Sequence, residues 1–221
     1  VVPVYNEKAT LGEIIKRVQA VNIPTEIIVV DDASTDGSKH IVRQLAKKPG
    51  IKAFFHPHNQ GKGISIRTGI KHALGKYILI QDADLEYDPQ DYFKLLKPIQ
   101  DGKAQVVYGS RFTGERRNMF FWHWVANQCL TLLTNILYNT TLSDMETCYK
   151  LFPAALIKSL KLNCRRFEFE PEVTAKILRQ GIRIYEVPIS YAGREYWEGK
   201  KIAWQDGFIA LFTLIRYRFL S

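Results

Sequence analysis

The chain has 221 residues, of which 46% are apolar, so it can bury one sizeable core, and two full domains would be a tight fit. Its 31 basic and 22 acidic residues give a net charge of +9, which favours an anionic partner such as a nucleotide, a phosphorylated lipid, an anionic membrane surface or a nucleic acid. Its three cysteines, without paired metal spacing, support neither a disulfide framework nor a zinc site and fit a reducing cytosolic compartment.

Short runs of β-branched and aromatic residues alternate with helical patterns through the first half of the chain. The predicted strands cover residues 1–5, 26–31, 51–56, 77–81 and 105–110. The predicted helices cover residues 10–21, 38–47, 63–74 and 89–100. Thr10 with Glu13 forms a candidate capping box for the first helix, and Ser38 or Asp36 is the candidate cap of the second. This alternation predicts an α/β fold with a mostly parallel central sheet flanked by helices.

The second half, from residue 112 onward, is richer in aromatic residues. The run 120–124 leads into an apolar stretch over 130–138, and the chain closes with apolar residues at helical spacing between 204 and 219. Polar residues interrupt both segments, so neither is a clean membrane span. Two alternatives follow: amphipathic helices packed on the core, or a basic amphipathic surface lying on an anionic membrane, with the cations Lys200, Lys201, Arg216 and Arg218.

Polar clusters stand where four of the predicted strands end, at residues 5–7, 31–34, 58–63 and 82–84. Because ligands of parallel α/β sheets bind at the carboxyl ends of the strands, these clusters are predicted to meet at one edge of the sheet. Asp82 and Asp84 are one residue apart after an apolar run, so their carboxylates can converge on one divalent cation and hold it against a diphosphate. An Asp-x-Asp pair is also common in solvated loops.

Five motifs occur here in one order: Pro3-Val4-Tyr5-Asn6-Glu7, Val30-Asp31-Asp32-Ala33-Ser34, Asn59-Gln60-Gly61-Lys62-Gly63, Asp82-Ala83-Asp84-Leu85 and Gly109-Ser110-Arg111-Phe112. Together they resemble family 2 glycosyltransferases of the GT-A fold, over essentially the whole chain. The motif at 143–150 and the tail at 194–201 are similar to the polyprenyl-phosphate branch, typified by dolichol-phosphate mannose synthase. This resemblance implies one catalytic domain over 1–221, with a nucleotide-sugar half to about 111 and an acceptor and membrane-facing half from about 112.

The resemblance also implies roles at the donor site. The residues implied to bind a nucleotide-diphospho-sugar are, in chain order, Pro3, Tyr5, Glu7, Val30, Asp32, Lys62, Asp82, Ala83, Arg194 and Lys200. The first five would line the nucleoside pocket. Asp82 and Asp84 would coordinate Mg²⁺ or Mn²⁺, which neutralises the charge that grows on the departing diphosphate. Glu86 is either a third metal ligand or a solvated loop carboxylate. Arg194 and Lys200 stand in a segment that in relatives folds over the diphosphate, although a solvated charge run would look similar.

At the acceptor site the resemblance points to Arg111, whose guanidinium suits a phosphate geometrically. Dolichol-phosphate mannose synthases have a second arginine where this chain has Trp124, so His123 and Asn127 are the substitute candidates, with a packed or solvated histidine as the plainer alternative. Asp144 stands where many GT-A enzymes keep a catalytic carboxylate, and it is either a general base or a structural residue. A lipid phosphate is already anionic near neutral pH, so it needs positioning and charge compensation more than a base.

One functional hypothesis and three alternatives follow. The hypothesis is a metal-dependent, inverting transfer of a hexose from a GDP-sugar or UDP-sugar to a polyprenyl phosphate, by a protein peripherally associated with the cytoplasmic face of the membrane. A second version uses a polysaccharide or glycolipid hydroxyl as acceptor and makes Asp144 the obligatory base. A nucleotidyltransferase is disfavoured because residues 3–7 lack a glycine-rich, basic signature. A nucleic-acid-binding module is disfavoured because the predicted sheet edge carries acidic and polar clusters.

Overall fold

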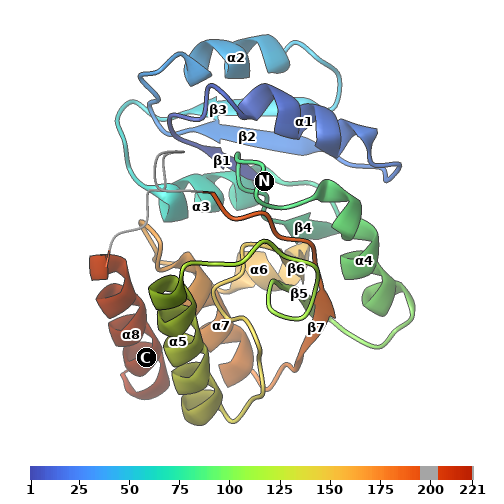
Figure 1. The fold of residues 1–221 in the computed structure, drawn as a ribbon. Coiled ribbons are helices and arrows are strands. Elements are labelled where there is room, and N and C mark those ends of the chain that lie inside the picture. Colours follow the sequence, from blue (N-terminus) through green and yellow to red (C-terminus); the bar gives the residue numbers. More distant parts are fainter. Residues whose placement is uncertain (195–203, 221) are drawn as a thin grey trace.

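The structure of the protein is a computed structural model that describes residues 1–194 and 204–220 (Figure 1). Its first sheet is parallel and follows the order β1-β2-β3, with β1 (Val2–Val4), β2 (Ile27–Asp31) and β3 (Ile51–Phe55). Every residue of β1 and β2 is buried, which explains why both strands are nearly continuous apolar runs in the sequence.

The second sheet is mixed and follows the order β4-β6-β5-β7. Its strands are β4 (Tyr77–Leu79), β5 (Val106–Ser110), β6 (Lys150–Pro153) and β7 (Ile184–Pro188). β6 pairs antiparallel with β4 and β5, and β5 pairs in parallel with β7. The two sheets join at Val1, whose amino group donates to the Leu79 carbonyl over 2.8 Å and whose carbonyl accepts from the Gln81 N–H over 2.9 Å. The polar segments that follow β1 and β4 therefore lie side by side.

The predicted α/β fold is confirmed, with two strands that the sequence pattern did not reveal. All five predicted strands form, and β4 ends two residues earlier than expected. The missed strands are β6 and β7. β6 begins with Lys150, which is completely buried, and β7 contains Glu186, whose carboxylate accepts from the Ser143 N–H over 2.8 Å. A charged residue inside a short strand interrupts the apolar pattern by which strands are recognised.

Four predicted helices of the first half are present: α1 (Leu11–Ala20), α2 (Ser38–Leu45), α3 (Lys62–His72) and α4 (Tyr92–Gln100), the last following a single 3₁₀ turn, η1 (Pro89–Asp91). α2 packs against β2 and β3, α3 against β1 and β2, and α4 against β5 and β7. α1 directs toward the core the side chains of Leu11, Ile14, Ile15 and Val18. This i, i+3, i+4, i+7 spacing is that of one helical face, so burial of an apolar stripe stabilises the helix.

The helix starts connect the first half of the chain to the loop after β4. The predicted Thr10–Glu13 capping box is wrong, because the Thr10 hydroxyl donates to the Ala83 carbonyl over 2.9 Å and Glu13 pairs with Arg17 on the helix surface. At α2, the Asp36 carboxylate accepts from the Ser38 N–H over 2.9 Å, as a cap does. The Ser38 hydroxyl in turn accepts from the Glu7 N–H over 2.8 Å. The contacts of Thr10 and Ser38 hold in place the polar segments that follow β4 and β1, respectively.

The second half supplies α5 (Phe121–Tyr138), α6 (Ala154–Ser159), α7 (Phe169–Arg179) and α8 (Trp204–Phe219). α5 and α8 run side by side below the sheets, and α7 packs on α8 (Figure 1). The Tyr138 hydroxyl donates to the Leu214 carbonyl over 2.7 Å and ties α5 to α8. The predicted amphipathic helices are therefore present. α7 was not predicted, because its first turn buries Glu170 and Glu172 and so lacks a clear apolar face in the sequence.

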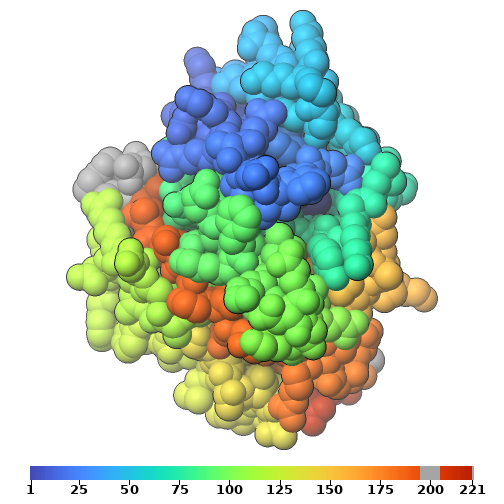
Figure 2. Space-filling view, turned by 90° about the vertical axis from the view of Figure 1, so that its right-hand side faces the viewer, coloured from blue at the N-terminus to red at the C-terminus, as the bar shows by residue number. Residues whose placement is uncertain are grey.

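One large apolar cluster joins the strands of both sheets, and a smaller cluster around Leu142, Met145 and Leu214 lies between α5 and α8. The space-filling view shows the N-terminal elements in blue at one end, α4 in green at the centre, and the second half in yellow and orange at the other end (Figure 2). Within residues 1–194 and 204–220, no helix combines the length and the apolar character needed to cross a membrane.

Candidate active site

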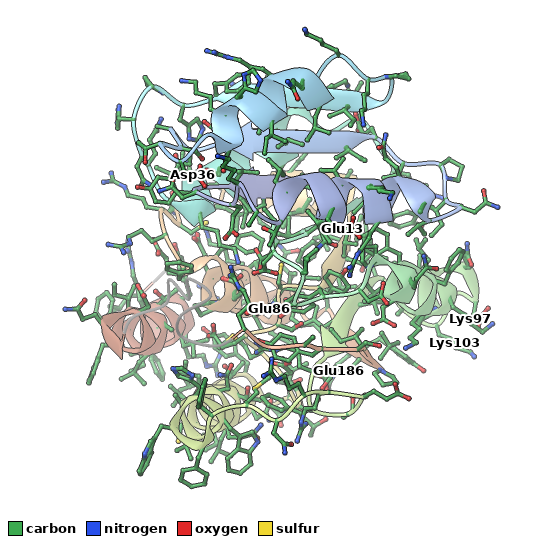
Figure 3. All side chains as sticks on the ribbon, turned by 45° about the horizontal axis from the view of Figure 1, so that its top comes forward. Glu13, Asp36, Glu86, Lys97, Lys103 and Glu186 are labelled. Atoms are coloured by element: carbon green, nitrogen blue, oxygen red, sulfur yellow. The ribbon has the colours of Figure 1, made fainter. Side chains whose placement is uncertain are left out.

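A cavity of about 710 Å³ opens at the carboxyl ends of β1, β2 and β4, between these strands and helices α5 and α8. It brings together most of the predicted site residues, namely Pro3, Tyr5, Glu7, Asp32, Lys62, Asp82, Ala83, Asp84, Glu86, Arg111, His123, Asn127 and Arg194. Glu86 lies at the centre of the molecule, between the N-terminal layer and the α5–α8 layer, whereas Lys97 and Lys103 lie at its edge (Figure 3).

Three predicted residues stand outside the cavity lining or outside the described chain. Val30 is buried in β2, within the apolar core. Asp144 is completely buried behind Arg111. Lys200 lies outside the described residues, as do its neighbour Lys201 and the rest of the predicted diphosphate loop up to residue 203.

Asp32 organises the loop that precedes α3. Its Oδ1 atom accepts from the Gln60 N–H over 2.9 Å and pairs with His56 Nδ1 at 2.7 Å, and its Oδ2 atom accepts from the Gly61 N–H over 2.7 Å. Gly61 has a φ of +100°, and a Cβ atom there would collide with the Arg165 carbonyl oxygen, so only glycine suits this turn. The Asp32 carboxylate is thus held rigidly at this end of the cavity.

Lys62, the first residue of α3, pairs with two carboxylates in the cavity. Its Nζ atom lies 2.8 Å from Asp82 Oδ1 and 3.3 Å from Glu170 Oε1. Burial opposes the charged form of Lys62, but Asp82 and Glu170 outweigh it and hold the pKa of the ammonium well above its ordinary value. Burial likewise opposes ionisation of Asp82, and Lys62 keeps the pKa of this carboxyl below its ordinary value. Asp82 is therefore an anion near neutral pH.

Arg194 contacts the other acidic residues of the same wall. Its guanidinium lies 2.8 Å from Asp84 Oδ2, 3.2 Å from Glu86 Oε1 and 3.4 Å from Glu7 Oε2. Burial first, and then the charges of Asp82 and Glu86, raise the pKa of Asp84 to about 8, although Arg194 opposes the rise. Several carboxylates are thus crowded together, and a cation in this place stabilises all of them.

The paired aspartates fit a hard divalent cation. Mg²⁺ and Mn²⁺ prefer oxygen ligands, and Mg²⁺ is usually held by one or two carboxylates together with substrate phosphates and water. Among the described residues no group of three or more His, Cys, Asp or Glu side chains is arranged to hold a metal ion. Glu86 is neither solvated nor free, because its carboxylate accepts from Arg194 and, over 2.9 Å, from the Tyr191 hydroxyl.

A buried polar network that the sequence did not reveal fixes the turn of the two aspartates. Gln81 Oε1 accepts hydrogen bonds of 2.7 Å from the hydroxyls of Tyr92 and Tyr149, and Gln81 Nε2 donates to the Asp82 carbonyl over 2.9 Å. Burial raises the pKa of both tyrosines, so these hydroxyls stay protonated and donate. A glutamine next to an acidic motif gives no signal of this role until its partners are known.

Arg111 and Asp144 form a bidentate ion pair. Arg111 Nε lies 2.7 Å from Asp144 Oδ2 and Arg111 Nη2 lies 2.8 Å from Asp144 Oδ1, while the Arg111 N–H donates to Oδ2 over 2.9 Å. Arg111 Nη2 also donates to Asn127 Oδ1 over 3.0 Å, and Asn127 donates to the His123 carbonyl over 2.7 Å. Both oxygens of Asp144 are occupied, which favours the structural alternative: Asp144 orients Arg111, and Arg111 faces the cavity.

Three further charged residues surround the cavity and were not singled out by the sequence patterns: Glu146, Lys150 and Glu170. Glu146 and Glu170 line the cavity. The Lys150 ammonium donates to the carbonyls of Met145, over 2.8 Å, and Thr147, and it lies 4.6 Å from the centre of the Tyr108 ring. The only sequence signal for Glu146 and Lys150 is their place in the motif at 143–150, of which only Asp144 was a predicted site residue.

The profile described as "Glycosyl transferase family 2" matches residues 1–160 of this chain. The chain belongs to glycosyltransferase family 2. An uncharacterized protein of Methanocaldococcus jannaschii is 31% identical to this glycosyltransferase over 222 residues, which cover 97% of the chain and 89% of that protein.

Two curated relatives of this glycosyltransferase have described activities. An undecaprenyl-phosphate 4-deoxy-4-formamido-L-arabinose transferase of Edwardsiella ictaluri is 30% identical over 210 residues, and a dodecaprenyl-phosphate galacturonate synthase of Rhizobium johnstonii is 28% identical over 206 residues. Each match covers 90% of this chain. The chain spans 61% and 60% of the lengths of these two enzymes.

Solved structures show the same fold. Glucosyl-3-phosphoglycerate synthase of Mycobacterium tuberculosis, in complex with phosphoglyceric acid, superposes with a TM-score of 0.77 at 18% identity and covers 100% of this chain and 79% of that chain. Mannosyl-3-phosphoglycerate synthase of Rubrobacter xylanophilus superposes with a TM-score of 0.75, also at 18% identity, covering 98% of this chain and 70% of that chain. The glycosyltransferase therefore has the GT-A fold.

Proposed function

We propose that this nucleotide-sugar glycosyltransferase transfers a hexose, with inversion, from a GDP-sugar or UDP-sugar to a polyprenyl phosphate, using Mg²⁺ or Mn²⁺. One observation carries the proposal: the cavity places Arg111, a buried arginine fixed by Asp144 and Asn127, in the same space as the aspartate pair Asp82 and Asp84. A cation suited to a phosphate acceptor thus faces the groups suited to a metal diphosphate.

The donor diphosphate would lie along the wall of Lys62, Asp82 and Asp84. A divalent cation held by the two aspartates supplies charge neutralisation for the departing nucleoside diphosphate. Lys62 pairs with Asp82 and keeps this carboxylate ionised and ready to bind. Arg194 contacts the carboxylates of Asp84 and Glu86. When the donor binds, the guanidinium would leave these carboxylates and bind the diphosphate. Support for a metal and nucleotide-sugar also comes from the related structure of the Mycobacterium tuberculosis synthase with Mn²⁺ and UDP-glucose.

The acceptor phosphate would bind at Arg111. Its oxygen attacks the anomeric carbon from the side opposite the departing diphosphate, which inverts the configuration. A phosphate monoester is anionic near neutral pH, so the reaction needs charge compensation and alignment and no proton acceptor. Asp144, whose oxygens are both bound to Arg111, supports positioning and not base catalysis. The version with a hydroxyl acceptor and Asp144 as base is therefore the less supported one.

The surface around the cavity mouth suits a lipid. Trp122 lines the cavity and is 78% exposed, and Phe208 of the neighbouring α8 is 64% exposed. Further exposed apolar side chains on the same two helices are Phe121, Leu132, Ile136, Phe212 and Phe219. Arg216 and Arg218 add positive charge to α8. Apolar side chains with adjacent cations are the pattern of a protein that lies on an anionic membrane surface, and we place this surface at the cytoplasmic face.

Single-turnover transfer tests the proposal. Radiolabelled GDP- and UDP-sugars are mixed with enzyme and polyprenyl phosphate, with Mn²⁺ or Mg²⁺ or with chelator, and the label in the organic phase is counted. We expect labelled lipid with metal, and a loss of label with chelator and in Asp84→Asn. The matched control is Asp101→Asn, which removes an exposed carboxylate paired with Lys97 and Lys103. If the enzyme binds or hydrolyses the donor but no lipid becomes labelled, the proposal of a lipid acceptor is overturned.

A further inference from the structure

One carboxyl group of the cavity has no role in the proposed reaction. Glu146 lies in the segment that leads into β6 and lines the cavity together with Lys62 and Arg111. Its Oε1 atom is shut off from solvent and accepts no hydrogen bond from the residues that the structure describes. A buried carboxylate oxygen without a donor is costly, and such atoms mark places where a ligand completes the hydrogen bonding.

The other carboxylates of this wall already have cationic partners. Asp144 binds Arg111 with both oxygens, and Asp82 and Glu170 share Lys62. Lys150 lowers the pKa of Glu146 electrostatically, but its ammonium donates to the backbone carbonyls of Met145 and Thr147, before β6. Among the residues that the structure describes, Glu146 Oε1 thus has no hydrogen-bond donor.

Glu146 lines the same cavity as Lys62 and Arg111, which are proposed to serve the donor and acceptor phosphates. Glu170 acts most strongly on it, and Glu170 pairs with Lys62, which pairs with the metal aspartate Asp82. Arg111, the acceptor-phosphate candidate, also acts on Glu146 and lines the same cavity. The transferred sugar is bonded to the donor diphosphate and attacked by the acceptor phosphate, so it must lie in this cavity between the two phosphates.

We propose that Glu146 is a specificity-determining residue whose carboxylate accepts a hydrogen bond from a hydroxyl group of the transferred hexose. The inference rests on the proposed function, because it requires a nucleotide-sugar in the cavity. Sugar hydroxyls are neutral donors, and a carboxylate is an acceptor with several lone pairs. A site built to bond a hydroxyl rejects analogues that lack it, because its own polar group is then left unpaired.

The ionisation of Glu146 agrees with this role. Burial first, and then the charge of Glu170, raise the pKa of the Glu146 carboxyl to about 7, while Lys150 and Arg111 lower it and Asp144 raises it further. A hydroxyl that donates to the carboxylate stabilises the charged form. Sugar binding is therefore expected to release a proton near neutral pH, which calorimetry in buffers of different ionisation enthalpy detects.

The test compares the affinities of nucleotide and nucleotide-sugar. With Mn²⁺ present, calorimetry gives Kd for UDP and UDP-glucose, UDP-galactose and UDP-N-acetylglucosamine, and for GDP and GDP-mannose. We expect Glu146→Ala to weaken the preferred nucleotide-sugar about tenfold to hundredfold and to leave the free nucleoside diphosphate unchanged. Glu146→Gln keeps a weaker, neutral acceptor and should lose less. Glu13→Gln, on the exposed surface of α1, is the matched control for loss of one charge.

Two results with these variants would overturn the proposal. Equal weakening of nucleotide and nucleotide-sugar in Glu146→Ala would show a structural role. Normal nucleotide-sugar affinity in Glu146→Gln with abolished turnover would show a general base instead. If Glu146→Ala does not fold, deoxy analogues of the preferred sugar are tested on the wild-type protein, and uniform binding of all of them would also refute it. Because the affinity measurements include no acceptor, failure of lipid transfer and failure of this inference are separate outcomes.

Discussion

Replacement of Glu146 by glutamine should stabilise the protein in a way that depends on pH. The pKa of the folded-state carboxyl is about 7, compared with an ordinary value of 4.5, chiefly because the side chain is buried. The folded protein therefore holds this proton more tightly than the unfolded chain. By linkage, the free energy of unfolding falls as pH rises from about 4.5 through about 7, and the whole loss is present above that range.

The size of this effect follows from the same shift. Each pKa unit corresponds to about 1.4 kcal/mol, so the ionised carboxylate costs the folded state about 3 kcal/mol at pH 8. Glutamine has nearly the same shape and does not ionise. The difference in free energy of unfolding between Glu146→Gln and the wild-type protein should therefore grow by about 3 kcal/mol, in favour of the variant, between pH 4.5 and pH 8.

Urea unfolding, followed by tryptophan fluorescence at half-unit pH steps, measures this difference directly. Glu13→Gln is the control, because Arg17 lowers the pKa of Glu13 at the surface. Loss of the Glu13 carboxyl should therefore change the free energy of unfolding with pH in the opposite direction. A difference between Glu146→Gln and wild type that stays constant across this range would refute the reasoning, since it would show that the Glu146 carboxyl titrates normally in the folded protein.

Three further changes test the site. Asp144→Asn leaves the buried guanidinium of Arg111 uncompensated and should cost about 3–5 kcal/mol of unfolding free energy in urea; full stability with no turnover would instead identify a base. Arg194→Ala removes the cation that occupies Asp84, so Mn²⁺ affinity without donor, measured from the free-ion EPR signal, should rise about tenfold or more, and an unchanged affinity would contradict this. Gln81→Leu leaves two buried tyrosine hydroxyls without their acceptor and should cost about 3 kcal/mol by urea unfolding; a neutral effect would show that the network does not hold the aspartate turn.

The first half of the fold is predictable from sequence because β1, β2 and β5 are buried along their whole length and its helices have one apolar face. β2 and α1 show these two patterns. The second half is predicted less completely, because charged residues occupy interior positions of β6 and α7. Lys150 is completely buried in β6, where backbone carbonyls and the Tyr108 ring compensate its charge. Local patterns assign such residues to the surface, and the compensating partners become visible only in three dimensions.

The candidate site shows the same division. The motifs identify Asp82, Asp84 and Arg111 as chemically important, and the cavity brings them together. They do not show that Arg111 pairs with Asp144, which lies 33 positions further along the chain. They also do not distinguish Glu146 from any other glutamate, because its character depends on burial and on neighbouring charges from α7 and β6. Residue types can be read from one sequence, but pairings across the fold cannot.

Helix α5 connects the cavity to the exposed apolar surface, and this spacing has a consequence for the proposed lipid acceptor. Asn127 accepts a hydrogen bond from Arg111 inside the cavity, while Trp122, five positions earlier, is largely exposed. These positions are about 7 Å apart along a rigid helix axis. A phosphate at Arg111 would therefore stand at a fixed height above the lipid surface, and only the first isoprene units would enter the protein. Acceptors of different tail length should then react at similar rates, so selectivity would reside in the head of the lipid.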